Sequence, residues 1–528
     1  MTTTRSGHQP GRGEWWRTAA IYQIYIRSFA DGNGDGNGDL AGIRSRLGYL
    51  AGLGVDAVWI TPFYPSPLAD GGYDVADYRD VDPMFGDIGE FKALLGEAHA
   101  RGLRVIIDLV PNHTSSRHQW FQEALAGEPG ARERYLFRDG NGDQPPNDWE
   151  SVFGGPAWTR VADGQWYLHL FDPAQPDLNW DNVEVRAEFE EILRFWLDLG
   201  VDGIRIDVAH GMVKAHGLPD TGRTRQIELL GQAELPYFDQ DGVHEIYRAW
   251  RKILDSYPGE RMAVAEAWAP NAERLAHYLR PDELHQAFNF HYVKAGWDAG
   301  QFRQVIDESL AAVAEVDAPA TWVLSNHDIV RHVTRLGGVR RARAAALLTL
   351  ALPGSAYLYQ GEELSLPEVT DLPEEVLADP MWERSGHTER GRDGCRVPIP
   401  WSGKASPFGF STSAPWLPQP ESWSELTVEA QESEEDSTLS LYRKALRLRR
   451  SVTGEFAWLE APEGVLGFRR GRDFVCTVNF TGEAVDLGLP HRPVLSSVPL
   501  DGGLLPPHSA VWWQAREQRR AEGEDTMP

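Results

Sequence analysis

Three times in the first half of the chain, an amphipathic helix ends at a glycine and an apolar strand follows at once. The apolar residues of the first of these helices share one face: Ile43, Leu47, Leu50 and Leu53. Gly54 ends that helix, and the strands of the three units are expected at 55–61, 104–110 and 203–208. Strands that alternate with helices lie parallel in one sheet, with the helices packed outside it. The repeat therefore predicts an α/β fold.

Five further segments are rich in β-branched and aromatic residues and are expected to be strands: 21–29, 262–266, 286–290, 321–328 and 356–360. Eight strands that alternate with helices are the signature of a (β/α)8 TIM barrel. A Gly/Pro/Trp-rich stretch, 113–179, interrupts the repeat after the third strand, and short alternating strands follow residue 453. We therefore predict a TIM barrel with an inserted loop-rich domain after strand 3 and a C-terminal antiparallel β domain.

The domain boundaries follow from these interruptions, because a chain of 528 residues is too long for one hydrophobic core. The predicted parts are a flexible N-terminus at 1–13, the barrel at 14–112 and 180–445, the inserted B domain at 113–179, the β domain at 446–516 and a flexible tail at 517–528.

The net charge of −27 argues against nucleic acid or an anionic membrane as a partner, because a polyanion would be repelled. It permits a small neutral substrate. The chain has two cysteines, so no disulfide framework is expected, and it has no run of 18 apolar residues that could span a membrane. These features favour a cytoplasmic protein, and they leave its oligomeric state unknown.

A glycine-rich loop follows the first strand and carries an oxygen-bearing side chain at every second position: Asp31, Asn33, Asp35, Asn37 and Asp39. This spacing is typical of the first part of a calcium loop, so a structural Ca²⁺, or Mg²⁺, is expected there. The glutamate that would close an EF-hand at the twelfth position is replaced by Gly42. The alternative is an Asx/Gly turn in which Asp39 caps the next helix.

Four carboxylates are predicted at the C-terminal ends of barrel strands, where TIM-barrel active sites lie: Asp108, Asp207, Glu266 and Asp328. Like charges repel, so such a cluster is a poor structural device, but hydrolysis of an acetal needs one carboxylate as nucleophile and one carboxylic acid as proton donor. Arg205 lies two residues before Asp207 on the same strand face and would keep that carboxylate ionised. An Arg–Asp pair of purely structural use is the alternative.

Four segments around these carboxylates resemble, in order, the four sequence blocks of the α-amylase family of retaining glycoside hydrolases (glycoside hydrolase family 13): 108–113, 203–207, 265–268 and 325–328. Three more, 72–74, 175–179 and 359–363, are similar to auxiliary motifs of that family. The resemblance implies that Asp207 is the nucleophile, that Glu266 is the general acid and base, and that Asp328 holds two hydroxyls of the sugar. It also implies that no metal takes part in the chemistry.

The resemblance further implies a set of substrate contacts. His113 and His327 would hydrogen-bond the glucose, and Arg205 would support Asp207. Asp74 and Arg396 would form a pair that grips the far hydroxyls of a terminal glucose and so closes the pocket. The residues Phe153 and Phe171 would line the pocket, and Trp268 would keep Glu266 protonated by its hydrophobic character.

Segment 175–179 resembles the oligo-1,6-glucosidase and α-glucosidase branch of the family, and the loop at 31–39 is similar to a metal loop of that branch. Val208, directly after Asp207, accompanies α-1,6 cleavage there, but 325–331 departs from the form usual in oligo-1,6-glucosidases. The prediction is thus a retaining, exo-acting α-glucosidase that releases glucose from short malto- or isomalto-oligosaccharides, with the linkage open.

Three alternatives remain. The first is an α-glucosyl transferase or isomerase of the trehalose or sucrose isomerising type, which would share every residue named above and differ in how water is excluded. The second is a non-catalytic sugar-binding homologue, although all three catalytic carboxylates are present. The third is an endo-amylase that degrades starch.

Overall fold

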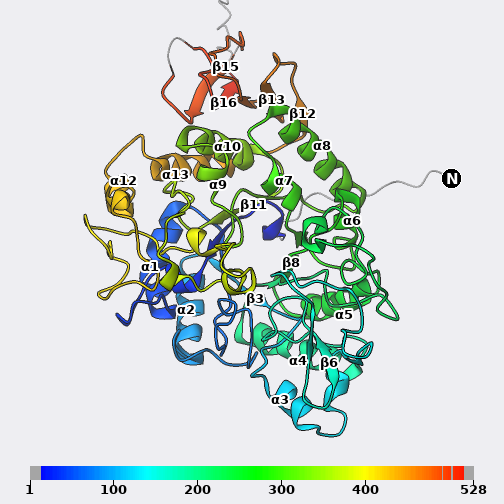
Figure 1. Cartoon of the computed structure of the whole chain (residues 1–528). Helices are drawn as coiled ribbons and strands as arrows, with labels where there is room; N and C mark the ends of the chain where they lie inside the picture. The colour runs from blue at the N-terminus through cyan, green and yellow to red at the C-terminus, as the bar shows by residue number, and fades with distance from the viewer. Residues whose placement is uncertain (1–13, 490, 501–502, 516–528) are drawn as a thin grey trace, which may run out of the picture.

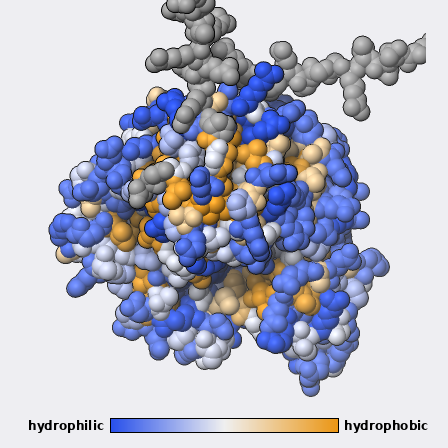
Figure 2. Space-filling view, turned by 90° about the horizontal axis from the view of Figure 1, so that it is seen from above, coloured by the Kyte–Doolittle hydropathy of each residue, from blue (hydrophilic) through white to orange (hydrophobic). Residues whose placement is uncertain are grey.

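The computed structural model describes residues 14–489, 491–500 and 503–515 (Figure 1). The predicted flexible ends, 1–13 and 517–528, lie outside the described residues. Two segments project from opposite sides of the central barrel in Figure 1: the C-terminal sheet at the top and the segment with α3 and β6 at the bottom. Figure 2 shows a surface that is largely hydrophilic, with smaller apolar areas between.

The predicted TIM barrel is confirmed: the central sheet has eight parallel strands in the order β10-β11-β1-β2-β3-β7-β8-β9. Their bounds are β1 (Ala20–Ile24), β2 (Ala57–Ile60), β3 (Arg104–Leu109), β7 (Gly203–Ile206), β8 (Met262–Ala265), β9 (Gln286–Ala287), β10 (Thr321–Val323) and β11 (Ser355–Tyr359). Several strands end earlier than predicted. The expected strand 321–328 stops at Val323, and its last residues form the turn that carries Asp328.

Helices alternate with the strands of the barrel. They are α1 (Leu40–Leu53), α2 (Ile88–Ala100), α4 (Val183–Leu199), α5 (Val243–Ser256), α6 (Ala272–His277), α7 (Phe290–Lys294), α8 (Ala299–Glu315), α9 (His332–Arg335) and α10 (Val339–Ala351). Their ends follow the expected chemistry. Asp39 accepts the Gly42 N–H at the start of α1, and Gly54 ends that helix with φ 98°.

The insertion after β3 contains α3 (Gln119–Ala126) and a small antiparallel sheet of β4 (Phe137–Asp139), β5 (Trp158–Arg160) and β6 (Gln165–Leu168). The connection between β7 and α5 packs against it, because Trp149 Nε1 donates to Pro219 O at 2.9 Å and Asn147 Nδ2 donates to Leu218 O at 3.1 Å. The insertion and the β7–α5 connection therefore together cover the C-terminal end of the barrel.

The chain after β11 contains α11 (Pro380–Arg384), α12 (Val428–Glu432) and α13 (Thr438–Arg449). It then forms an antiparallel sheet in the order β12-β13-β14-β16-β15, made of β12 (Phe456–Trp458), β13 (Val465–Arg470), β14 (Phe474–Asn479), β15 (His491–Ser496) and β16 (Ser509–Ala515). Trp512 Nε1 donates to Leu347 O of α10 at 3.0 Å and joins this sheet to the barrel. The predicted first residue of the domain, 446, lies within α13.

Cys395 and Cys476 are both buried and free, as expected for a chain without a disulfide framework. Among the described residues, no helix combines the length and the apolar character needed to cross a bilayer.

Candidate active site

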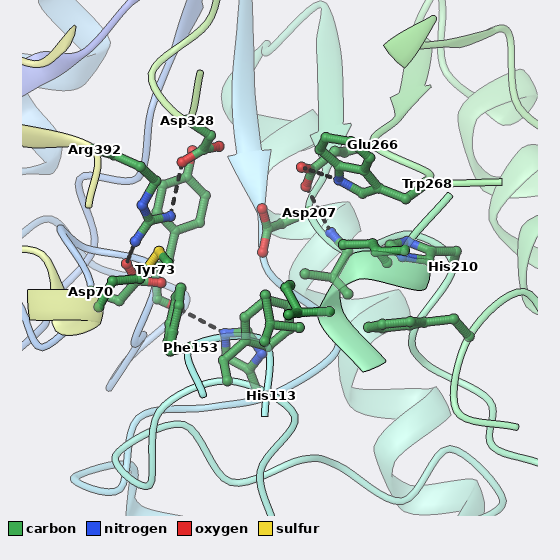
Figure 3. Close-up of a pocket in the computed structure, with 17 residues that line it drawn as sticks. Asp70, Tyr73, His113, Phe153, Asp207, His210, Glu266, Trp268, Asp328 and Arg392 are labelled. Atoms are coloured by element: carbon green, nitrogen blue, oxygen red, sulfur yellow. Dashed lines mark hydrogen bonds and ion pairs between the residues drawn. The ribbon is translucent and has the colours of Figure 1, made fainter. Parts of the chain in front are cut away.

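A cavity of about 240 Å³ opens at the C-terminal ends of the barrel strands (Figure 3). Six of the predicted site residues line it: His113, Phe153, Phe171, Asp207, Glu266 and Asp328. Three of them follow the strands β7, β8 and β10, and the other three belong to the insertion after β3, so residues far apart in the chain meet at one place. Asp328, Arg392 and Asp70 lie on one side of Figure 3, Glu266, Trp268 and His210 on the other, and Asp207 between them.

Arg205 lies beneath this cavity and joins three carboxylates. Its Nη1 donates to Asp108 Oδ1 at 2.7 Å and to Asp207, and its Nη2 lies 2.8 Å from Glu266 Oε2. The strand register explains the first contact, because Arg205 on β7 pairs with Asp108 on β3. Arg205 is fully buried, and Asp207 and Glu266 are 6% and 7% exposed. A single buried cation thus holds Asp207 and Glu266 in one arrangement.

The surroundings of Asp207 act on its pKa in opposite directions. Burial raises the pKa of Asp207 well above its ordinary value, and Glu266 and Asp108 add to this effect, while Arg205 opposes it. Arg205 cannot hold Asp207 ionised by itself, because its one charge is shared with two other carboxylates. Asp207 and Asp108 share one guanidinium, so the protonation of one affects the pKa of the other.

This shift predicts the acid limb of the pH–rate profile. Asp207 attacks only as a carboxylate, so activity should fall as the pH drops through its raised pKa. We expect the acid limb of kcat/KM to lie above the ordinary pKa of aspartate, about 3.9. The measurement is kcat/KM for a neutral α-glucoside across the pH range in which the protein stays folded. An acid limb at or below the ordinary value would contradict the assignment.

Glu266 is held by hydrogen-bond donors rather than by hydrophobic surroundings alone. Val208 N donates to Glu266 Oε2 at 3.1 Å, and Trp268 Nε1 donates to Oε1 at 3.3 Å. The Val208 backbone has φ 44°, a region that β-branched residues rarely adopt, directly after the end of β7. Trp268 stacks on Phe290 with 3.8 Å between ring centroids. The expected apolar role of Trp268 is thus incomplete, because its indole N–H also faces the carboxyl.

Asp328 is the most strongly paired carboxylate of the cavity. Its Oδ1 accepts from Arg392 Nη1 at 2.9 Å and from Arg396 Nη2 at 3.0 Å. Burial alone would raise the pKa of Asp328, but the neighbouring His327 and the positive charges of Arg392 and Arg396 outweigh it and lower that pKa. Asp328 is therefore an ionised acceptor, suited to hold the hydroxyls of a sugar.

The predicted pair of Asp74 and Arg396 is wrong, since the pair that faces the cavity is Asp70 and Arg392. Arg392 Nη2 lies 2.7 Å from Asp70 Oδ1, and both residues line the cavity. Asp74 is fully buried behind it and accepts from Ser66 Oγ and Asp70 N, and burial raises its pKa to about 6. Sequence spacing does not distinguish the two pairs, because Asp70 lies two residues before the 72–74 motif and Arg392 lies four residues before Arg396.

Arg396 instead supports the turn that carries Asp328. Its Nε donates to His327 O at 2.9 Å, so it fixes the backbone as well as the carboxylate. Asp379 pairs with both arginines. Its Oδ2 accepts from Arg392 Nε at 2.5 Å and lies 3.8 Å from Arg396 Nη1. Arg392, Arg396, Asp328 and Asp379 form one buried network at the closed end of the cavity.

The two predicted histidines lie on this side as well. His113 lines the cavity, with Nε2 3.1 Å from Gln175 Nε2 and 3.2 Å from Tyr73 O, and burial lowers its pKa to about 4. His327 does not line the cavity. It lies behind Asp328, stacked on Tyr73 at 5.2 Å, and its Nε2 is 3.2 Å from Asp328 Oδ2. Neutral imidazoles can donate to a sugar hydroxyl or orient a carboxylate without adding charge.

The loop at 31–39 forms the Asx/Gly turn of the alternative expectation. Asp31 accepts from Asn33 N, Gly34 N and Gly36 N, and Asp39 accepts from Gly32 N and Gly42 N. Within the described residues, no group of three or more His, Cys, Asp and Glu side chains is placed to hold a metal ion. Asn37 Oδ1 is taken by Arg27 at 3.1 Å. Asn33 and Asp35 are exposed, so their oxygens stay open to an ion from solution.

The chain is similar to several known proteins. Residues 23–454 match the family described as alpha amylase, catalytic domain. The chain is 39% identical over 533 residues to a probable alpha-glucosidase of Rhizobium meliloti (strain 1021), with 95% of each chain covered. It is 36% identical to an oligo-1,6-glucosidase of Parageobacillus thermoglucosidasius, covering 83% of this chain and 84% of the other.

A solved structure described as an alpha-glucosyl transfer enzyme, XgtA, superposes with a TM-score of 0.86 at 37% identity, covering 95% of this chain and 99% of that one. The superposed structure and the family match both cover the whole barrel. The carboxylates gathered at the C-terminal ends of the strands are thus set in the scaffold that these proteins share, and the chain belongs to the α-amylase family of glycoside hydrolases.

Proposed function

We propose that this protein is a retaining, exo-acting α-glucosidase that releases glucose from the non-reducing end of short α-glucosides. The observation that carries the proposal is the closed end of the cavity, where Arg392 bridges Asp70 and Asp328. A glucose whose far hydroxyls meet this network has no room for a further sugar beyond it. The names of the two curated relatives support the same class of substrate.

The residues divide the work of a double displacement. Asp207 attacks C1 and forms a glucosyl ester, while Glu266 gives its proton to the glycosidic oxygen and the alcohol leaves. Glu266 then takes a proton from water, which attacks C1 and releases glucose with its configuration retained. Asp328 holds the sugar hydroxyls throughout, because its two arginines keep it ionised.

The test is kcat/KM for maltose and isomaltose, with the released glucose followed by its anomeric form. We expect glucose as the first product, in the α-anomeric form, and slow loss of iodine staining with amylose. Release of maltose or longer fragments first would contradict exo action, and initial β-glucose would contradict retention. The ratio of the two rates also settles the linkage.

Transfer to a sugar acceptor is a second candidate, favoured by the likeness to the α-glucosyl transfer enzyme. Both activities use the same glucosyl ester and differ in whether water or an alcohol attacks it. Product analysis at low substrate concentration separates them, because a hydrolase then yields free glucose. Transfer or isomerised products in excess of glucose would favour this second function.

We also propose a structural Ca²⁺ in the loop at 31–39, held by Asp31, Asn33 and Asp35. Asp35 is exposed, and among the described residues its Oδ2 accepts only from Asn33 Nδ2, so it can turn toward a cation. The two oxygens of Asp31 accept two hydrogen bonds each, so binding Ca²⁺ there exchanges some of these bonds for the ion. Adding Ca²⁺ after chelation is expected to raise Tm by about 2–4 °C, as for a ligand at roughly 100 times its Kd. Asp31→Asn should abolish that response, and an unchanged Tm in the native protein would argue against the ion.

A further inference from the structure

The two halves of the cavity differ in their charged groups, although aromatic side chains such as Phe153, which lies against Arg392, also line the charged half. The half that would hold the glucose has Asp70, His113, Asp328 and Arg392 in its lining. The other half is formed largely by five apolar side chains, which we call the acceptor wall: Val208, Ile227, Leu230, Phe238 and Trp268. Among the described side chains that line this half, the polar ones are Glu266 and His210.

Four members of the acceptor wall are placed by their side-chain contacts, and Ile227 is placed by the backbone N–H of Leu230, which donates to Ile227 O at 3.2 Å. Val208 follows Asp207 and donates its N–H to Glu266, and the Phe238 ring lies 4.4 Å from the His210 ring. Leu230 packs in the same cluster as Val208 and Phe238. The next residue, Gly231, lies against Trp268, because a Cβ at that position would be 3.5 Å from its ring. The wall therefore surrounds the acid Glu266.

This side must receive the leaving alcohol. Glu266 protonates the glycosidic oxygen, so the group attached to that oxygen extends toward Glu266 and away from Asp328 and Arg392 (Figure 3). The group that leaves, or the alcohol that later attacks, thus rests on the acceptor wall. The chemistry of the wall sets which alcohols fit.

A second sugar fits this wall poorly. It carries several hydroxyls, and each hydroxyl that is buried without a partner weakens binding. His210 offers two ring nitrogens that have no partner among the described residues, and it is 2% exposed. Burial lowers the pKa of His210 to about 4, so the ring is neutral near pH 7. One neutral imidazole can satisfy one or two hydroxyls, and the five apolar residues satisfy none.

We propose that the preferred leaving groups and acceptors of this site are apolar alcohols, so that its substrates include alkyl and aryl α-glucosides. This inference rests on the proposed function and adds the class of aglycone. In the forward step, the C1–O bond breaks, Asp207 bonds to C1 and the alcohol oxygen takes the proton of Glu266. In transfer, an apolar alcohol attacks C1, its proton passes to Glu266 and the carboxylate of Asp207 is released.

The experiment compares methyl and n-butyl α-glucoside, whose alcohols have nearly equal basicity and differ in apolar length. A fully buried methylene is worth about fourfold in binding, so three partly buried ones should raise kcat/KM about tenfold from methyl to n-butyl. With p-nitrophenyl α-glucoside as donor, 1-butanol should yield n-butyl α-glucoside. Equal kcat/KM for the two alkyl glucosides would overturn the proposal.

Variants tie the preference to the wall. Ile227→Asn removes apolar surface from the wall, so it should lower the ratio of kcat/KM for n-butyl over methyl α-glucoside about threefold. The Ile227 side chain is partly exposed, so the fold tolerates a polar group there. Leu230→Asn tests the same point from a second position. Leu125→Asn, a similarly exposed apolar residue on α3 outside the cavity lining, should leave the ratio unchanged. An unchanged ratio in both wall variants would overturn the inference, whereas no release of glucose from any α-glucoside would instead overturn the proposed function.

Discussion

Asp207→Asn is expected to lower kcat/KM for p-nitrophenyl α-glucoside by a factor on the order of 10⁴ or more, with the fold intact. The amide has the shape of the carboxylate but cannot form the glucosyl ester. Arg205 keeps its contacts with Asp108 and Glu266, so the buried cation is not left unpaired. Circular dichroism and Tm check the fold. Asp307→Asn, a half-exposed residue on α8, is the matched control and should keep the native rate.

A second experiment separates the nucleophile from the acid. In Asp207→Ala, azide can occupy the space of the lost carboxyl and displace the leaving group from the α-glucoside directly, which yields β-glucosyl azide. In Glu266→Ala, Asp207 still forms the ester, and azide attacks that ester and yields α-glucosyl azide. The configuration of each product therefore assigns each role. Exchanged products would show that the two assignments are reversed, and a near-native rate in Asp207→Asn would remove Asp207 from the mechanism.

The barrel could be predicted because its signals are local. Helix faces of 3.6-residue period, glycine ends such as Gly54 and β-branched strands each lie within a short window of the chain. Asp207, Glu266 and Asp328 follow from the barrel, since the C-terminal ends of parallel strands meet at one face. The predicted ends of the strands were less accurate. Residues 324–328 look like a continuation of β10, but the strand stops at Val323, Asn326 Oδ1 accepts from Asp328 N in a turn, and Asp328 lines the cavity.

The choice of Asp70 and Arg392 could not be read from spacing. Arg392 and Arg396 flank a short 3₁₀ helix (Asp393–Cys395), so both reach Asp328. Which of them faces the sugar depends on how the long segment after β11 crosses the barrel mouth. The same holds for the acceptor wall, because Ile227, Leu230 and Phe238 belong to an irregular connection with no periodic pattern. Both features are set by tertiary packing.

Arg392→Met should lower kcat/KM for p-nitrophenyl α-glucoside by a factor on the order of 10²–10³, because truncating one partner of a buried charge network leaves the others unpaired. Arg392 lies within 2.7 Å of Asp70, 2.9 Å of Asp328 and 2.5 Å of Asp379. Without it, Asp328 keeps Arg396 but loses the contact that closes the cavity. Arg390→Met, two residues earlier on the same segment, is the control and should stay within a few fold of the native rate.

Variants of this network show which of two aspartates, Asp70 or Asp74, acts with an arginine on the glucose. Asp70→Asn removes the charge that Arg392 meets at the cavity, so it should impair kcat/KM more than Asp74→Asn, whose side chain lies outside the lining. Arg392→Lys should fall between the native protein and Arg392→Met, because one ammonium keeps the charge but cannot span three carboxylates. A larger loss for Asp74→Asn, at equal Tm, would mean that substrate binding reorganises the closed end and brings Asp74 into contact with the glucose.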